Sequence, residues 1–194
     1  MFAESLEHTD PIPAAAHEPA SPAEAYALHF GLVFRNLRRL GVDEAVIEDA
    51  VQDVFLVVFR RWGEFEQRSS LRTWIFGIVV RIAHDHRRAR KRHVARLRLA
   101  QQDADMRPPV ESPHVDAELR EATRLLHTVL DRLNDEQRTL IVLVDLEEIP
   151  TAEVAEIMNL NPSTCRGKIV AARQAFAVAV ERFTTDLPFE RNDR

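Results

Sequence analysis

The chain has little cysteine, little glycine and no long apolar run, and each shortage excludes a class of protein. Cys165 is the only cysteine among 194 residues, so no disulfide can form within the chain, which fits a reducing compartment. No apolar run approaches the roughly 20 residues that span a bilayer, and the first residues lack a secretory signal, so we expect a cytoplasmic protein. With only five glycines and few alternating β-branched runs, the sequence predicts an all-α fold.

Positive charge is concentrated in one stretch of an otherwise acidic chain. The formal net charge is −5, yet residues 60–98 carry twelve Arg or Lys and three acids, which leaves this stretch at about +9. Trp62, Phe65 and Trp74 are interleaved with these bases. Basic charge mixed with aromatic rings suits a polyanion whose bases can stack or flip out, so the stretch predicts a nucleic-acid surface.

Patterning divides the chain into two small helical domains joined by a flexible linker. We expect a disordered tail over 1–20, a first domain over 21–100, a linker over 101–115, a second domain over 116–186 and a tail over 187–194. Three helices are predicted in the first domain. The first begins at a capping box of Ser21 and Glu24, and the second runs from a cap at Asp43 until Gly63 stops it. The third begins after Ser69-Ser70 and turns strongly basic beyond Ala83.

The second domain has the layout of a helix-turn-helix. Asn134 to Gln137 is an N-terminal capping signature, and two helices follow at about 151–158 and 163–182, separated by a short turn. Residues 103–156 hold fourteen acids and five bases, so the sign of the charge reverses across the linker. Cys165 and Ile169 are expected to face inward from the last helix, and Arg166, Lys168 and Arg173 to face outward.

Motifs in both predicted domains resemble those of the extracytoplasmic-function (ECF) group of bacterial sigma factors. Glu48-Asp49-Ala50-Val51-Gln52-Asp53-Val54-Phe55 resembles the signature of the group, and Leu71-Arg72-Thr73-Trp74-Ile75-Phe76 resembles its promoter-melting segment. In the second domain, Glu153 to Ile157 and Thr164 to Lys168 resemble its DNA-reading domain. The resemblance covers residues 25–182 and implies a non-enzymatic promoter-specificity subunit of RNA polymerase, without metal or cofactor.

The resemblance implies a role for each motif. The acidic helix face would dock on core RNA polymerase, through Glu48, Asp49, Gln52, Asp53 and Phe55. A second group would read and melt the −10 promoter element: Arg68, Ser69, Ser70, Arg72, Thr73, Trp74, Arg81, Arg87 and Arg88. The last helix would read the −35 element in the major groove, through Ser163, Thr164, Arg166, Gly167, Lys168 and Arg173.

The resemblance also implies partners, and the chain departs from the family pattern at a few positions. Promoter DNA, core polymerase and an anti-sigma factor are the expected partners, and the free protein should be a monomer. Arg81 stands where Asn is usual, Ser163 where Gly is common and Ala171 where Arg is common. Pro150 replaces a capping Ser, so Thr151 is expected to cap instead.

The sequence also suggests two functions other than that of a sigma factor. An ordinary helix-turn-helix regulator would bind duplex DNA without polymerase, but it needs neither the acidic face nor the Trp74 segment. A metal phosphohydrolase is suggested by His84 and His86, yet residues two apart on a helix point about 200° apart and cannot easily share one ion.

Overall fold

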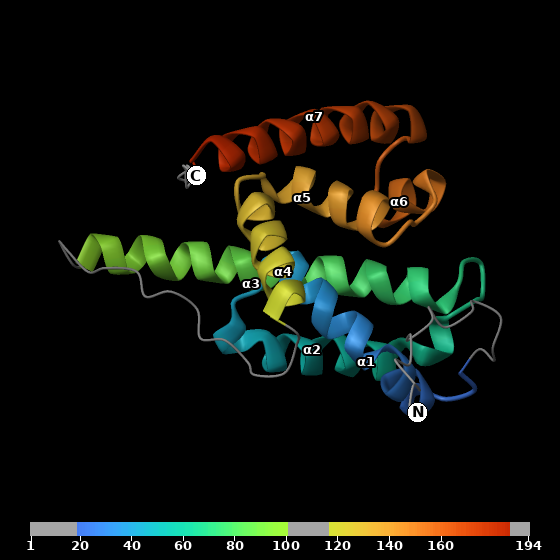
Figure 1. Ribbon diagram of the computed structural model, residues 1–194. Coiled ribbons are helices and arrows are strands. Elements are labelled where there is room, and N and C mark those ends of the chain that lie inside the picture. Colours follow the sequence, from blue (N-terminus) through green and yellow to red (C-terminus); the bar gives the residue numbers. More distant parts are fainter. Residues whose placement is uncertain (1–18, 101–116, 187–194) are drawn as a thin grey trace, which may run out of the picture.

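Two helical domains make up the part of the chain that the structure describes. The computed structural model describes residues 19–100 and 117–186, and every regular element within them is helical (Figure 1). The all-α prediction is therefore confirmed. The predicted linker over 101–115 and the predicted tail over 187–194 lie outside these residues. The predicted tail over 1–20 lies outside them as well, apart from positions 19 and 20.

The N-terminal domain packs three long helices around one core. These are α1 (Pro22–Arg39), α2 (Ile47–Arg61) and α3 (Leu71–Ala100), and α2 is flanked by the 3₁₀ turns η1 (Glu44–Val46) and η2 (Trp62–Glu64). The apolar residues that recur at helical spacing meet in the core, where Val33, Leu37, Val54, Val58, Ile75, Phe76 and Val79 are fully buried. The basic end of α3 extends past the other two helices (Figure 1).

The predicted helix ends hold in most respects, with three differences. Ser21 Oγ accepts a bond from the Glu24 amide at 3.2 Å, but the Glu24 carboxylate accepts from the Ala20 amide, so the reciprocal box is not formed. Asp43 caps η1 rather than α2 itself. Gly63 lies inside η2, so the α-helix ends at Arg61, where the chain tightens into a 3₁₀ turn, and not at Gly63.

Gly41 ends α1 in a conformation that favours glycine. Its φ is +85°, and the amides of Gly41 and Val42 donate to the carbonyls of Arg38 and Leu37, which forms a Schellman motif. A Cβ at this position would also collide with the guanidinium of Arg138 in the other domain. Gly41 therefore allows both the turn and the close approach of the second domain.

The C-terminal domain contains four helices and one π-helical segment. They are α4 (Ala117–Asp131), α5 (Asp135–Ile141), the π segment η3 (Val142–Leu146), α6 (Thr151–Ile157) and α7 (Pro162–Asp186). Asn134 and Gln137 form the predicted capping box, with each side chain accepting from the backbone amide of the other. The core contains Leu130, Leu140, Leu143, Val154, Cys165 and Ala172.

Helices α6 and α7 form the predicted helix-turn-helix. A Schellman motif ends α6, with Asn159 at φ 51° and the Leu160 amide donating to the Ala155 carbonyl at 2.8 Å. The expectation that Thr151 caps α6 is wrong, because Pro150 takes the cap position without a side-chain bond and Thr151 is the first helical residue.

Candidate nucleic-acid and polymerase interfaces

The acidic face of α2 is open to solvent. Glu48, Asp49 and Gln52 are exposed, as a docking surface requires. Asp53 is half-buried, and its Oδ2 lies 2.9 Å from His86 Nε2 on α3. The expected docking residues therefore share one surface, and His86 holds the innermost carboxylate in place.

Phe55 differs from the other expected docking residues because it is buried. It is only 3% exposed and packs edge-on against Tyr26 of α1, with 4.6 Å between the ring centroids. Leu56 and Phe59 of the same helix are about half exposed, at 50% and 49%. Helical periodicity predicts that Phe59 lies on the buried side of this helix, so sequence reasoning misses this outward apolar surface.

The first turn of α3 holds the hydroxyls expected at the −10 element, and the second domain covers one of them. Ser70 Oγ accepts from the Thr73 amide at 3.1 Å and so caps the helix. Thr73 is 8% exposed, and its hydroxyl donates to the carboxylate of Glu153 in α6 at 2.5 Å. Trp74 is half-buried and packs against Phe65, with 5.4 Å between the ring centroids. In this arrangement Thr73 is bonded to protein.

Arg72, beside Thr73, is also held by the second domain. Its Nη2 donates to Glu147 Oε2 at 2.7 Å and to the Glu147 carbonyl at 3.1 Å. Arg39 of α1 donates to the other carboxylate oxygen at 2.6 Å, and Arg35 Nε lies 3.9 Å from that oxygen. One carboxylate of the second domain thus faces three guanidinium groups of the first.

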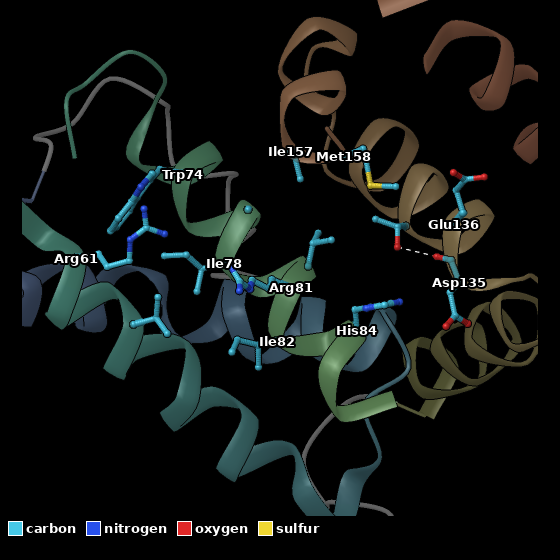
Figure 2. Close-up of a pocket in the computed structure, with 14 residues that line it drawn as sticks. Arg61, Trp74, Ile78, Arg81, Ile82, His84, Asp135, Glu136, Ile157 and Met158 are labelled. Carbon is cyan, nitrogen blue, oxygen red and sulfur yellow. Dashed lines mark hydrogen bonds between the residues drawn. The ribbon is translucent and has the colours of Figure 1, made fainter. Parts of the chain in front are cut away.

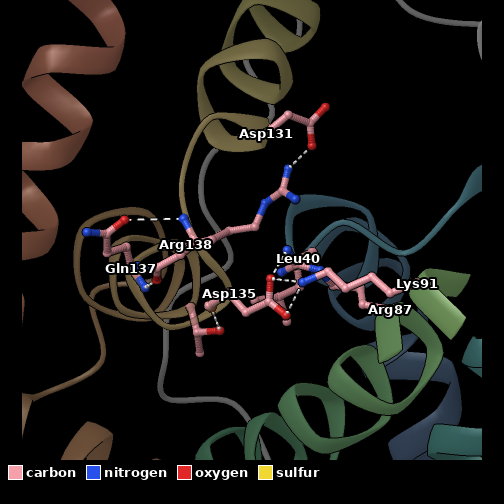
Figure 3. A network of polar contacts seen from close by, with 9 residues as sticks. Leu40, Arg87, Lys91, Asp131, Asp135, Gln137 and Arg138 are labelled. Carbon is pink, nitrogen blue, oxygen red and sulfur yellow. Dashed lines mark hydrogen bonds and ion pairs between the residues drawn. The ribbon is translucent and has the colours of Figure 1, made fainter. Parts of the chain in front are cut away.

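A second contact joins the basic part of α3 to the start of α5 (Figure 3). Arg87 bonds to the Leu40 carbonyl at 3.0 Å and to the Asp135 carboxylate, and Lys91 Nζ lies 3.0 Å from both oxygens of that carboxylate. Partial burial tends to raise the pKa of Asp135, but the bond from Lys91 and the charge of Arg87 outweigh burial and lower it. Asp135 is therefore held as an anion between two cations.

Arg138 closes the same interface from the side of the second domain. Its guanidinium pairs with Asp131 and lies against Gly41, while only 3% of the residue is exposed. Its Nε is buried without a partner. A buried donor without a partner costs free energy, so this unmet bond offsets part of the stabilisation that the pair with Asp131 contributes.

A groove of about 990 Å³ remains between the domains (Figure 2). Trp74, Arg81 and His84 line it from α3, and Asp135 and Met158 line it from the second domain. Arg81 is exposed, as are Arg68 and Arg88, and Ser69 is half-buried. Thus the second domain engages Arg72, Thr73 and Arg87 of the expected −10 group and leaves these four in contact with solvent.

The first turns of α7 carry exposed side chains. Ser163, Thr164, Arg166 and Gly167 are exposed, whereas Cys165 is fully buried, as expected. Two other expected −35 residues are engaged by carboxylates of their own domain. Lys168 Nζ lies 2.7 Å from the carboxylate of Glu136, and Arg173 Nη2 lies 2.7 Å from that of Asp145.

Neither a metal centre nor a membrane helix is found in the described part of the chain. Within residues 19–100 and 117–186, no three His, Cys, Asp or Glu side chains are grouped so as to hold a metal ion. No helix among these residues is long and apolar enough to cross a bilayer.

Comparisons with known proteins match both domains. Residues 25–93 match the family model described as Sigma-70 region 2, and residues 123–176 match the model of Sigma-70, region 4. Over 145 residues the chain is 26% identical to the RNA polymerase sigma-H factor of Pseudomonas aeruginosa, covering 72% of this chain and 75% of the relative. It is 27% identical over 134 residues to the ECF RNA polymerase sigma-E factor of Haemophilus influenzae, covering 66% and 71%.

A solved structure shows the same fold. The sigma factor RpoE of Bartonella quintana, crystallised with the anti-sigma factor NepR, aligns with a TM-score of 0.63 at 19% identity. The alignment covers 82% of this chain and 96% of that one.

Proposed function

The chain is an RNA polymerase sigma factor of the ECF group in the sigma-70 family, and we propose which of its surfaces perform each step of transcription initiation. The family is not enzymatic, so the chain acts by binding core polymerase and promoter DNA. The observation that carries the assignment is the separation of three surfaces: the acidic face of α2, the hydroxyl and basic face of α3, and the exposed first turns of α7. We propose that they bind polymerase, the −10 element and the −35 element, respectively.

The acidic α2 face is proposed to dock on core polymerase. Glu48, Asp49 and Gln52 project together from one side of a helix whose opposite side is buried, so their replacement should not disturb the core. The double variant D49A/Q52A should lose co-elution with core polymerase while its circular dichroism stays unchanged. A matched control replaces one exposed acid and one exposed amide of α7, in the variant Q174A/E181A. Equal binding by D49A/Q52A and the control would overturn the docking assignment.

The start of α3 is proposed to read and melt the −10 element. The hydroxyls of Ser70 and Thr73 lie 2.9 Å apart beside Trp74, which gives polar groups next to an aromatic face. Flipping a base costs about a few kcal/mol, and such a site on the single strand can offset that cost. Arg87 and Arg88 are proposed to hold phosphates. Replacing both by Ala should therefore flatten the salt dependence of DNA binding.

The N-terminal turns of α7 are proposed to enter the major groove at the −35 element. Arg166 is exposed near the start of α7, the second helix of the helix-turn-helix, so R166A should cost about 1–3 kcal/mol on the cognate element if Arg166 reads a base. A uniform loss on all sequences would show that it contacts phosphate only. Binding can be measured with holoenzyme on matched and mutated duplexes.

An anti-sigma factor is the proposed regulator of the free protein. The structural relative from Bartonella quintana was crystallised with such a partner and has the same fold. We further propose that the free protein is a cytoplasmic monomer and that it serves a restricted set of promoters.

Run-off transcription tests the proposed function as a whole. Core polymerase is supplied with and without the protein on a fragment from upstream of its own gene. A transcript that depends on the protein supports the proposal and maps both promoter elements. Absence of both a transcript and co-elution with core polymerase would overturn it.

A further inference from the structure

We propose that Arg35, Arg39 and Arg72 form a phosphate-binding site for the promoter strand, and that the carboxylate of Glu147 is a built-in competitor that occupies this site when the domains are closed. The inference rests on the proposed function, because it places the phosphate next to the proposed −10 residues. It goes further by assigning a role to two arginines of α1 and to one acid of the second domain.

The carboxylate is held as a bound ligand would be. The side chain of Glu147 is 3% exposed, and its two oxygens are taken by different arginines, at 2.6 Å from Arg39 and 2.7 Å from Arg72. Arg35 stands 3.9 Å away and remains half exposed. The contacts come from helices 108 and 75 residues away in the sequence, so this is a long-range contact between the domains.

Three guanidinium groups around one carboxylate leave an excess of positive charge. Burial lowers the pKa of Arg39, and the neighbouring charge of Arg35 lowers it further, against the opposing effect of Glu147. Burial and the charge of Arg72 lower the pKa of His29 on the same helix as well. A structural ion pair needs only one cation, whereas a surplus of arginines suits the repeated charges of a nucleic-acid backbone.

Glu147 is presented by a rigid turn. Its amide donates to the Val142 carbonyl at 3.0 Å at the end of the π segment, and the Ile149 amide donates to the Leu143 carbonyl at 2.9 Å. Glu148 follows with φ 54° and points its side chain to solvent. Of these two adjacent acids, Glu147 binds the three arginines and Glu148 faces solvent.

The same competition recurs along α3. Glu153 accepts the hydroxyl proton of Thr73, and Asp135 pairs with Arg87 and Lys91. At each place a carboxylate of the second domain binds a side chain that would otherwise contact the DNA strand. Closure of the domains and binding of the strand at Arg72, Thr73 and Arg87 are therefore mutually exclusive.

The experiment compares E147Q with E148Q, which changes the net charge equally one residue away. The probe is a fluorescein-labelled single-stranded DNA of mixed sequence, and the anisotropy is measured at low salt with the free protein. E147Q should bind about tenfold more tightly than wild type, because removing a charged competitor frees the site, whereas E148Q should match wild type within about twofold. Adding R39Q to E147Q should abolish the gain.

Three outcomes would overturn the proposal. They are an equal gain in E147Q and E148Q, a gain that survives R39Q, and no DNA binding by either wild type or E147Q. Circular dichroism of each variant excludes unfolding as the cause. Run-off transcription by the wild type is read separately. A wild-type transcript without a specific gain in E147Q would overturn the phosphate site and leave the proposed function standing, whereas failure of transcription and of core binding would overturn the function itself.

Discussion

His127 on α4 should make the protein less stable as the pH falls. Burial lowers its pKa from 6.5 to about 4, and the charges of Arg38, Arg138 and Arg39 add to this effect against the opposing charge of Asp131. In the unfolded chain the imidazole takes up a proton below about pH 6.5, whereas in the folded protein it stays neutral until about pH 4. The unfolded state therefore binds more protons between these values, and stability falls as the pH is lowered through this window.

The magnitude follows from the two pKa values. Complete burial would give a loss of about 2 kcal/mol on going from about pH 7.5 to about pH 5. His127 is only half-buried, so solvent screening reduces the expected loss to about 1 kcal/mol. The assay is urea unfolding followed by circular dichroism at both pH values.

The H127Q variant isolates this contribution from that of every other titrating group. Wild type should lose about 1 kcal/mol more than H127Q between the two pH values. H93Q, which replaces an exposed histidine of α3, is the control and should behave as wild type does. The same loss in H127Q as in wild type would refute the reasoning.

Two further predictions concern the second domain. N134A removes the side chain that accepts from the Gln137 amide at 2.9 Å, and it should lower the free energy of unfolding by about 1 kcal/mol, measured by urea unfolding. Q174A, at an exposed position of α7, is the control and should leave the free energy of unfolding unchanged. The thiol of Cys165 is fully buried and its burial raises its pKa, so it should react with a disulfide reagent only after unfolding, and rapid reaction of the native protein would show that the helix-turn-helix opens.

Features set by nearby residues could be predicted from the sequence. The caps at Ser21, Ser70 and Asn134 follow from side chains that reach an amide three residues away, and each is present. The inward position of Cys165 follows from helical periodicity. Such features depend on local geometry, which a single sequence specifies well.

Features set by tertiary contact could not be predicted in the same way. Phe55 belongs both to the signature that suggests docking and to the apolar side of its helix, so the sequence leaves core and contact open, and its packing against Tyr26 is fixed only by the fold. The π segment over Val142–Leu146 has no distinct periodic signal, because one wide turn shifts the pattern by a single residue. The contacts of Glu147 join residues that are 75 and 108 positions apart.

The charge reversal across the linker was visible in the sequence, but its structural consequence was not. Residues 60–98 carry about +9 and residues 103–156 about −9, a pattern that predicts a nucleic-acid surface on the first part and none on the second. In the fold, carboxylates of the second part form ion pairs with Arg72 and Arg87 of the first.

The acidic face of α2 stays exposed in this same closed arrangement. On the proposed assignments, docking on polymerase does not require the domains to separate, whereas binding of the promoter strand at Thr73 does. Docking through α2 and separation of the domains are then independent of each other, and E147Q should affect promoter binding without changing the affinity for core polymerase.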